Sequence, residues 1–142
     1  MAARAGRYGS FPTTADMGLW ATGNGAEALY EGLARALAAA TTDLRTVRPS
    51  VERTVTAVGR DPVGLAVAFL GELVTLFQVE GFVPRTVRVE LAGPERLALR
   101  ATLRGEPFDP ERHPRRIEVK AVTFHEAVFD AGRGRARLVV DI

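Results

Sequence analysis

The sequence contains no cysteine among its 142 residues. This absence excludes a disulfide framework, a thiolate zinc site and a cysteine nucleophile. A chain of this length suits one domain and can bury a core without covalent or metal cross-links. We therefore expect one domain in a reducing compartment, with the cytoplasm as the default location.

Long uninterrupted apolar runs are also missing. The most apolar stretch, residues 63–79, contains Gly64, Gly71, Glu72 and Gln78, so it predicts a buried helix rather than a membrane span. Residues 1–8 include two arginines, but no apolar segment follows them, and no secretory signal is predicted. We expect residues 1–8 to form a flexible N-terminal tail and residues 9–142 to form the domain.

Lysine is scarce, and neither sign of charge dominates. Lys120 is the only lysine, and 19 basic residues oppose 17 acidic ones, for a formal net charge of +2. No aromatic residues interleave with the arginines along the sequence, which argues against a stacking platform for single-stranded nucleic acid. The chain also lacks the G-x-S-x-G, P-loop, G-x-G-x-x-G and H-E-x-x-H motifs, so the sequence does not favour an enzyme.

Hydrophobic periodicity predicts two helices among several strands. Asn24 is the expected N-cap of a helix over residues 25–40, with Glu27 as its capping-box partner. Asp61 and Pro62 open a second helix, and Gly81 ends it. Strands are expected near residues 11–22 and at 51–58, 86–91, 97–104, 116–129 and 135–142, with a bulge near 121–122. This pattern predicts an α+β fold, a single domain of largely antiparallel sheets packed with two α-helices.

The end of the sequence places two carboxylates side by side. Asp141 is followed by the main-chain carboxylate of Ile142, at the end of a predicted strand. Two fixed carboxylates about 4 Å apart repel by roughly 4 kcal/mol at an effective dielectric constant near 20. A hard divalent cation would relieve this repulsion, and oxygen ligands favour calcium, magnesium or manganese over zinc. The alternative is a solvated, frayed end with two screened charges.

Three other polar residues, Asp16, Lys120 and His125, are candidates for a site. Asp16 precedes a predicted strand and is either a ligand or a turn-forming residue. Lys120 offers a compact ammonium in a chain that otherwise uses arginine. His125 is either a base or ligand, or a structural histidine, and His113 is expected to be exposed in a loop rich in proline.

The order of several motifs resembles the archease family. Thr14-Ala15-Asp16-Met17-Gly18 is similar to its N-terminal signature, and the likeness extends over roughly residues 11–142. The other matching segments are Thr42-Asp43-Leu44, Gly71-Glu72-Leu73, residues 105–113, residues 120–125 and Asp141-Ile142. Thr13 stands where the family usually has histidine.

The resemblance implies an accessory protein that activates the RNA-splicing ligase. That ligase joins a 2′,3′-cyclic phosphate to a 5′-hydroxyl through a guanylylated histidine, in tRNA splicing or RNA repair. The implied metal ligands are Asp16, Asp141 and Ile142, with calcium as the first choice and manganese or magnesium as alternatives. Lys120, Glu106 and His125 would face the ligase. RNA would be contacted only through the ligase, and no membrane partner is implied.

Two other functions remain open at this point. The same carboxylates could serve a free-standing, metal-dependent hydrolase of phosphate esters, although no nucleophile or base pair stands out. A metal-independent chaperone-like or RNA-binding module is the other alternative. Its binding would be unaffected by a chelator and would weaken strongly as the salt concentration rises.

Overall fold

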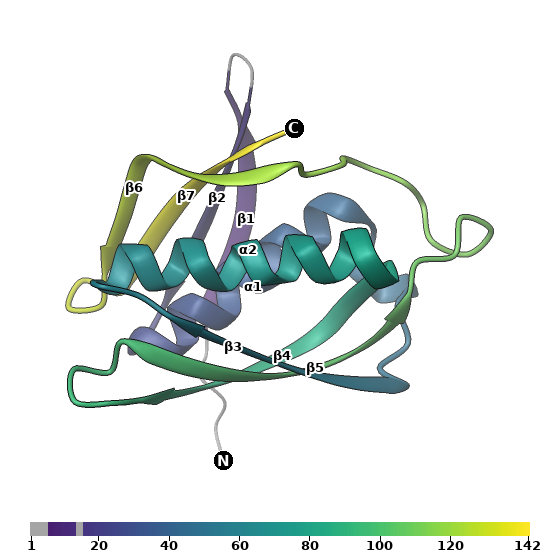
Figure 1. Ribbon diagram of the computed structural model, residues 1–142. Helices are drawn as coiled ribbons and strands as arrows, with labels where there is room; N and C mark the ends of the chain where they lie inside the picture. Colours follow the sequence, from purple (N-terminus) through teal and green to yellow (C-terminus); the bar gives the residue numbers. More distant parts are fainter. Residues whose placement is uncertain (1–5, 14–15) are drawn as a thin grey trace.

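Two antiparallel sheets enclose a pair of α-helices in the computed structural model, which describes residues 6–13 and 16–142 (Figure 1). One sheet has four strands in the order β1-β2-β7-β6, and the other has three in the order β3-β5-β4. The elements are β1 (Gly6–Pro12), β2 (Asp16–Gly23), α1 (Ala26–Thr41), a 3-10 turn η1 (Leu44–Thr46), β3 (Val51–Val58), α2 (Pro62–Glu80), β4 (Phe82–Ala92), β5 (Ala98–Pro107), β6 (Ala121–Asp130) and β7 (Arg135–Asp141). The predicted α+β class is confirmed.

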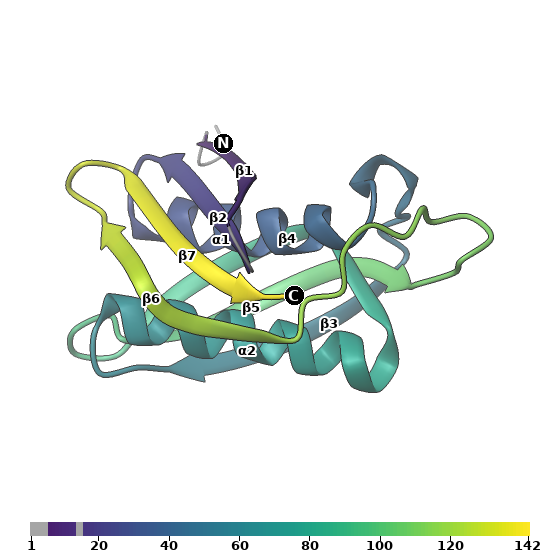
Figure 2. The same ribbon diagram turned by 90° about the horizontal axis from the view of Figure 1, so that it is seen from above.

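The core fills the space between the two sheets, around the helices. Figure 2 shows β6 of the four-stranded sheet passing over α2. Helix α1 packs on β1, β2 and β4, whereas α2 packs on β3 and β6. Leu33, Phe69 and Leu138 are fully or almost fully buried in this layer. Helix α2 has the length and apolar composition of a membrane span. It packs on β3 and β6, and 33% of its apolar stretch is buried, so the helix that the sequence analysis expected to be buried is buried on one face.

The second helix begins and ends as predicted. The Asp61 carboxylate accepts a hydrogen bond from the Gly64 N–H at 2.7 Å, and Pro62 occupies the first turn. Gly81 ends the helix in the left-handed conformation at φ 68°, where its N–H donates to the Phe77 carbonyl.

The first helix begins differently from the prediction. Its N-cap is Gly25 at φ 90°, and no side chain caps it, so the predicted Asn24–Glu27 capping box is wrong. The Glu27 carboxylate instead pairs with Arg96 at 2.6 Å, in the β4–β5 turn. A partner 69 residues away in the sequence has replaced the local one.

Strand boundaries show two further differences. Gly6 already pairs with Gly23, so β1 begins inside the segment that was predicted as tail, while residues 1–5 lie outside the described part of the chain. Strand β6 begins at Ala121 rather than at residue 116, because the N–H groups of Arg116 and Ile117 bind carbonyls at the end of α1. The irregularity in β6 falls between Thr123 and Val128 rather than at 121–122.

Candidate functional site

Asp16 and Asp141 lie directly opposite each other on neighbouring strands. They are paired in the antiparallel register of β2 and β7. Residues opposite each other in such a pair share a face of the sheet, with Cβ atoms about 4.5–5.5 Å apart. Asp16 is half-buried and Asp141 is exposed. The structure therefore brings together two carboxylates that lie 125 positions apart in the sequence.

Thr13 fixes the backbone of Asp16. The Asp16 N–H donates to the Thr13 hydroxyl oxygen, and the Thr13 N–H donates to the Asp16 carbonyl, both at 3.1 Å. The residue that departs from the family pattern thus closes the β1–β2 turn beside the first candidate ligand. Residues 14 and 15 of the predicted motif lie outside the described residues.

The donor set fits a hard cation only if the main chain contributes. Among the described residues, no cluster of three or more histidine, aspartate or glutamate side chains could hold a metal ion. Asp16 and Asp141 supply two carboxylates, and the third acidic group of the prediction is the main-chain carboxylate of Ile142, the residue next to Asp141. Oxygen donors of this kind suit calcium, manganese or magnesium.

Two of the predicted ligase-facing residues lie near these carboxylates. The Lys120 N–H donates to the Asp141 carbonyl at 2.8 Å, so the only lysine lies beside the end of β7. His125 lines a hollow on the outer side of the four-stranded sheet together with Asp16 and Arg137. The His125 imidazole lies 2.9 Å from the Glu126 carboxylate, and both side chains are exposed.

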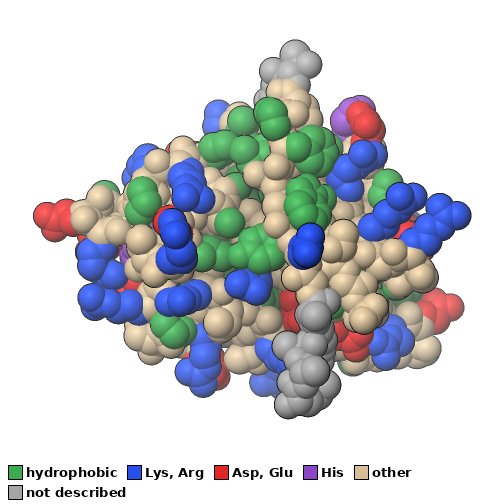
Figure 3. Space-filling model, turned by 180° about the vertical axis from the view of Figure 1, so that it is seen from behind, with side chains coloured by type: hydrophobic (Ala, Val, Ile, Leu, Met, Phe, Trp, Pro, Cys, Tyr) green, Lys and Arg blue, Asp and Glu red, His purple; other side chains and the backbone are tan. Residues whose placement is uncertain are grey.

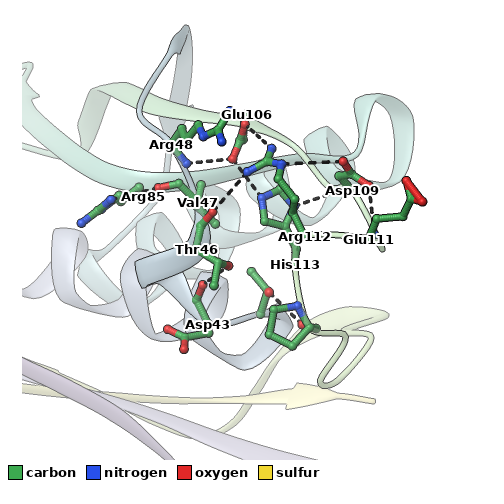
Figure 4. Close-up of polar contacts among 12 residues, drawn as sticks. Asp43, Thr46, Val47, Arg48, Arg85, Glu106, Asp109, Glu111, Arg112 and His113 are labelled. Atoms are coloured by element: carbon green, nitrogen blue, oxygen red, sulfur yellow. Dashed lines mark hydrogen bonds and ion pairs between the residues drawn. The ribbon is translucent and has the colours of Figure 1, made fainter.

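Glu106 is placed elsewhere. It lies at the end of β5 in the three-stranded sheet, and its side chain is buried (Figure 4). Its carboxylate accepts hydrogen bonds from the Arg112 guanidinium at 2.7 Å and from the Arg48 N–H at 2.8 Å. The Arg112 hydrogen bond is the main reason that the pKa of Glu106 falls to about 2. Its position indicates that it organises the loop over residues 107–113.

His113 is buried, and the expectation that it is exposed is wrong. The residue is 1% exposed because its ring packs beneath the loop, 2.9 Å from the Glu106 carboxylate. The Asp109 N–H donates to Nδ1 of His113 at 2.8 Å. Nδ1 must therefore be the acceptor, which leaves the proton on Nε2, where it is donated to Glu106. Figure 4 shows this arrangement around residues that come from three separate segments.

The comparisons with known proteins give the family. Residues 8–142 match the archease protein family (MTH1598/TM1083). The chain belongs to the archease family. Two curated relatives are archeases of Pyrococcus furiosus, 35% identical over 91% of this chain and 94% of that protein, and of Methanopyrus kandleri, 37% identical over 91% and 94%.

Solved structures support the same conclusion. The solution structure of Methanobacterium thermoautotrophicum protein 1598 has a TM-score of 0.80 at 33% identity and covers 98% of this chain and 99% of its own. The crystal structure of a Thermotoga maritima archease, described as a possible chaperone, has a TM-score of 0.54 at 19% identity over 93% and 94% of the two chains, so it shows the shared fold only.

Sequence reasoning missed the hollow beside the carboxylates. Its lining includes Phe11 from β1, Glu126 from the irregular part of β6 and Arg137 from β7. The Arg137 guanidinium reaches Glu126 only at long range, 3.4 Å to the carbonyl and 3.9 Å to the carboxylate. No sequence signal connects these segments, because strand order alone brings them together.

Proposed function

We propose that this member of the archease family is a metal-binding accessory protein that activates the RNA-splicing ligase. It promotes guanylylation of the ligase histidine and multiple turnover, in tRNA splicing or RNA repair in the cytoplasm. The observation that carries the proposal is the register of β2 and β7, which sets Asp16 opposite Asp141. Family membership supplies the ligase as the partner.

The proposed roles follow from where the residues lie. Asp16, Asp141 and the Ile142 carboxylate hold a divalent cation, with calcium preferred and manganese or magnesium as alternatives. When bound, such a cation would neutralise the negative charge that develops on a nucleotide phosphate as a nucleophile attacks it. Lys120, just before β6, and His125, in the middle of β6, lie near this site and face the ligase. Glu106 contributes indirectly, by holding the loop over residues 107–113.

Calorimetric titration tests the ligand set. We expect calcium or manganese to bind the wild-type protein, and Asp16→Asn or Asp141→Asn to weaken binding at least tenfold. Asp130→Asn, at the opposite end of the same sheet, is the matched control and should bind like the wild type. Unchanged affinity in Asp141→Asn would remove the proposed site.

The role of the Ile142 carboxylate has a test of its own. A short extension of uncharged residues after Ile142 converts its carboxylate to an amide without altering any side chain. Metal affinity should fall in this variant, while the thermal unfolding midpoint without metal stays the same. Equal affinity with and without the extension would exclude the terminal carboxylate as a ligand.

The function itself is tested with the purified ligase. Adding the protein should raise the rate of ligase guanylylation, and chelation or Asp16→Asn should abolish the increase. Hydrolysis of phosphate esters by the protein alone would favour a phosphoesterase instead. Stimulation that survives both chelation and Asp16→Asn would favour a chaperone-like role without metal.

A further inference from the structure

The outer face of the four-stranded sheet carries two aromatic rings that lie over glycines. Phe11 of β1 is opposite Gly18 of β2, and Trp20 of β2 is opposite Gly9 of β1. These residues share the face of the sheet that points away from the helices, since Leu19 and Ala21 between them are buried in the core. Each ring thus covers the glycine across from it.

The glycines allow the rings to lie close against the backbone. A Cβ atom at Gly9 would meet three atoms of the Trp20 indole at nearly equal distances of 2.8–2.9 Å. A Cβ atom at Gly18 would overlap the Phe11 ring. The three indole atoms, Nε1, Cε2 and Cζ2, are neighbours on one side of the ring system, so the Gly9 backbone lies close against that side of Trp20. Phe11 and Trp20 are both half-buried, so the rings keep surface exposed above the sheet.

Three arginines flank these rings on the same face. Arg7 and Arg135 are both paired with Thr22, one on each side of β2, and Arg137 is paired with Trp20. Arg7 and Arg135 are exposed. Figure 3 shows one face of the molecule with hydrophobic side chains gathered near its middle and Lys and Arg side chains on both sides of them.

Arg137 has unused hydrogen-bonding capacity. Its Nε is, among the described residues, the one buried side-chain nitrogen or oxygen without a hydrogen-bond partner. Its terminal nitrogen reaches only Glu126, at the long distances given above. The Arg137 side chain is nevertheless 42% exposed, and a partly exposed guanidinium beside a half-buried ring matches a phosphate next to a stacked base.

We propose that this face, defined by Phe11, Trp20, Arg7, Arg135 and Arg137, binds single-stranded RNA directly. This differs from the expectation from the sequence, in which aromatic residues and arginines do not interleave and RNA is contacted only through the ligase, because strand pairing brings these residues together. Bases stack on the two rings, and the arginines contact the backbone phosphates. The rings are about two residues apart along the strands, roughly 7 Å, which leaves room for neighbouring bases on separate rings.

The flat rings favour RNA over a protein partner. A protein interface gains most from aromatic side chains that insert into a pocket of the partner. A ring lying on the sheet offers one flat surface, which suits the planar face of a base and is tolerant of sequence. The three arginines add positive charge for the phosphates. Carboxylates on this face lie at the margins, with Asp16 and Asp141 at one end and Glu126 and Asp130 along β6.

The sole tryptophan gives a direct readout of this proposal. We expect a 12-nucleotide oligouridylate to quench Trp20 fluorescence as it binds, and a duplex RNA of equal length to bind far more weakly. The titration is done in EDTA, so that its outcome is independent of the proposed metal site. An absence of quenching at millimolar oligonucleotide would overturn the proposal.

Two variants distinguish the contribution of base stacking to RNA affinity from the contribution of charge. Phe11→Leu keeps an apolar cover over Gly18 but removes the ring, and should weaken binding by about 5- to 160-fold, the range for loss of one stacked base. Arg135→Gln with Arg137→Gln should weaken binding and reduce the slope of log affinity against log salt by about 1.4. Thermal unfolding checks that each variant is folded.

The matched control lies on the other sheet. Arg88 and Arg100 are exposed on the outer face of the three-stranded sheet, and Arg88→Gln with Arg100→Gln removes the same charge. This control should bind RNA like the wild type. If it lost as much RNA affinity as the Arg135→Gln, Arg137→Gln variant, binding would depend on overall positive charge and not on this face. If Trp20 responds to purified ligase but not to RNA, the face is a protein interface and the proposal fails.

Discussion

Glu106 ties together three segments through one carboxylate. It accepts from Arg48 after η1 and from Arg112 and His113 in the loop that follows β5. We expect Glu106→Gln to lower the free energy of unfolding by about 1–3 kcal/mol, since the Arg112 ion pair is lost and buried polar groups lose an ionised partner. Urea unfolding measures this change. Glu111→Gln, in the same loop but exposed, should cost far less.

The same carboxylate gives a pH dependence whose sign follows from its pKa. Folding lowers the pKa of Glu106 from 4.5 to about 2, chiefly through the Arg112 hydrogen bond. Because this pKa is lowered by folding, the ionised Glu106 carboxylate contributes its full share to the free energy of unfolding above about pH 4.5. That contribution is lost as the pH falls toward 2. Between these values the urea midpoint should fall more steeply in the wild type than in Glu106→Gln. Parallel curves would contradict the assignment.

At the scale of elements, α2 depends on a single capping side chain. Asp61 accepts from the Gly64 N–H, one of the amides that a helix start leaves without a partner. Asp61→Ala should therefore destabilise the protein by about 1 kcal/mol, whereas Asp61→Asn, which keeps an acceptor oxygen, should cost much less. Thermal unfolding of the two variants makes the comparison. Equal midpoints would mean that the cap contributes nothing.

Elements governed by local chemistry were predictable from the sequence. Strand β3 at Val51–Val58 has the predicted boundaries, and α2 has its predicted caps. Features that depend on distant partners were not. Glu27 forms an ion pair with Arg96 instead of the predicted capping box. His113 is buried because its ring forms hydrogen bonds with Glu106 and with the Asp109 N–H. The register of β2 and β7 agrees with the predicted closeness of Asp16 and Asp141, which the motif order had suggested.

The displaced bulge has a physical reason. Four residues of β6, 124–127, span the gap in which β7 has only Leu138, so β6 must bend there. Glu126 takes a positive φ of 48°, which a side chain other than glycine adopts only under constraint. Periodicity in the sequence detects that alternation slips but cannot place the slip when the inserted segment is longer than one residue.

For the whole molecule, the helical layer couples the two sheets. Phe69 of α2 is fully buried between them, and Phe69→Ala should cost about 3–5 kcal/mol. Because both sheets share this layer, far-UV circular dichroism and Trp20 fluorescence should report one unfolding transition at the same urea concentration. Two separate transitions would show that the four-stranded sheet unfolds on its own.

The position of β7 inside its sheet has a consequence for synthesis on the ribosome. Strand β7 lies between β2 and β6, although it is made after every other strand that the structure describes. The β1–β2 hairpin must therefore wait for more than a hundred further residues, on the order of 10 s of translation, before its neighbour exists. During that interval α1 can already cover the inward side chains of β2, but the backbone edge of β2 that pairs with β7 has no partner, and a nascent chain that stalls before residue 135 presents this open strand edge to other chains.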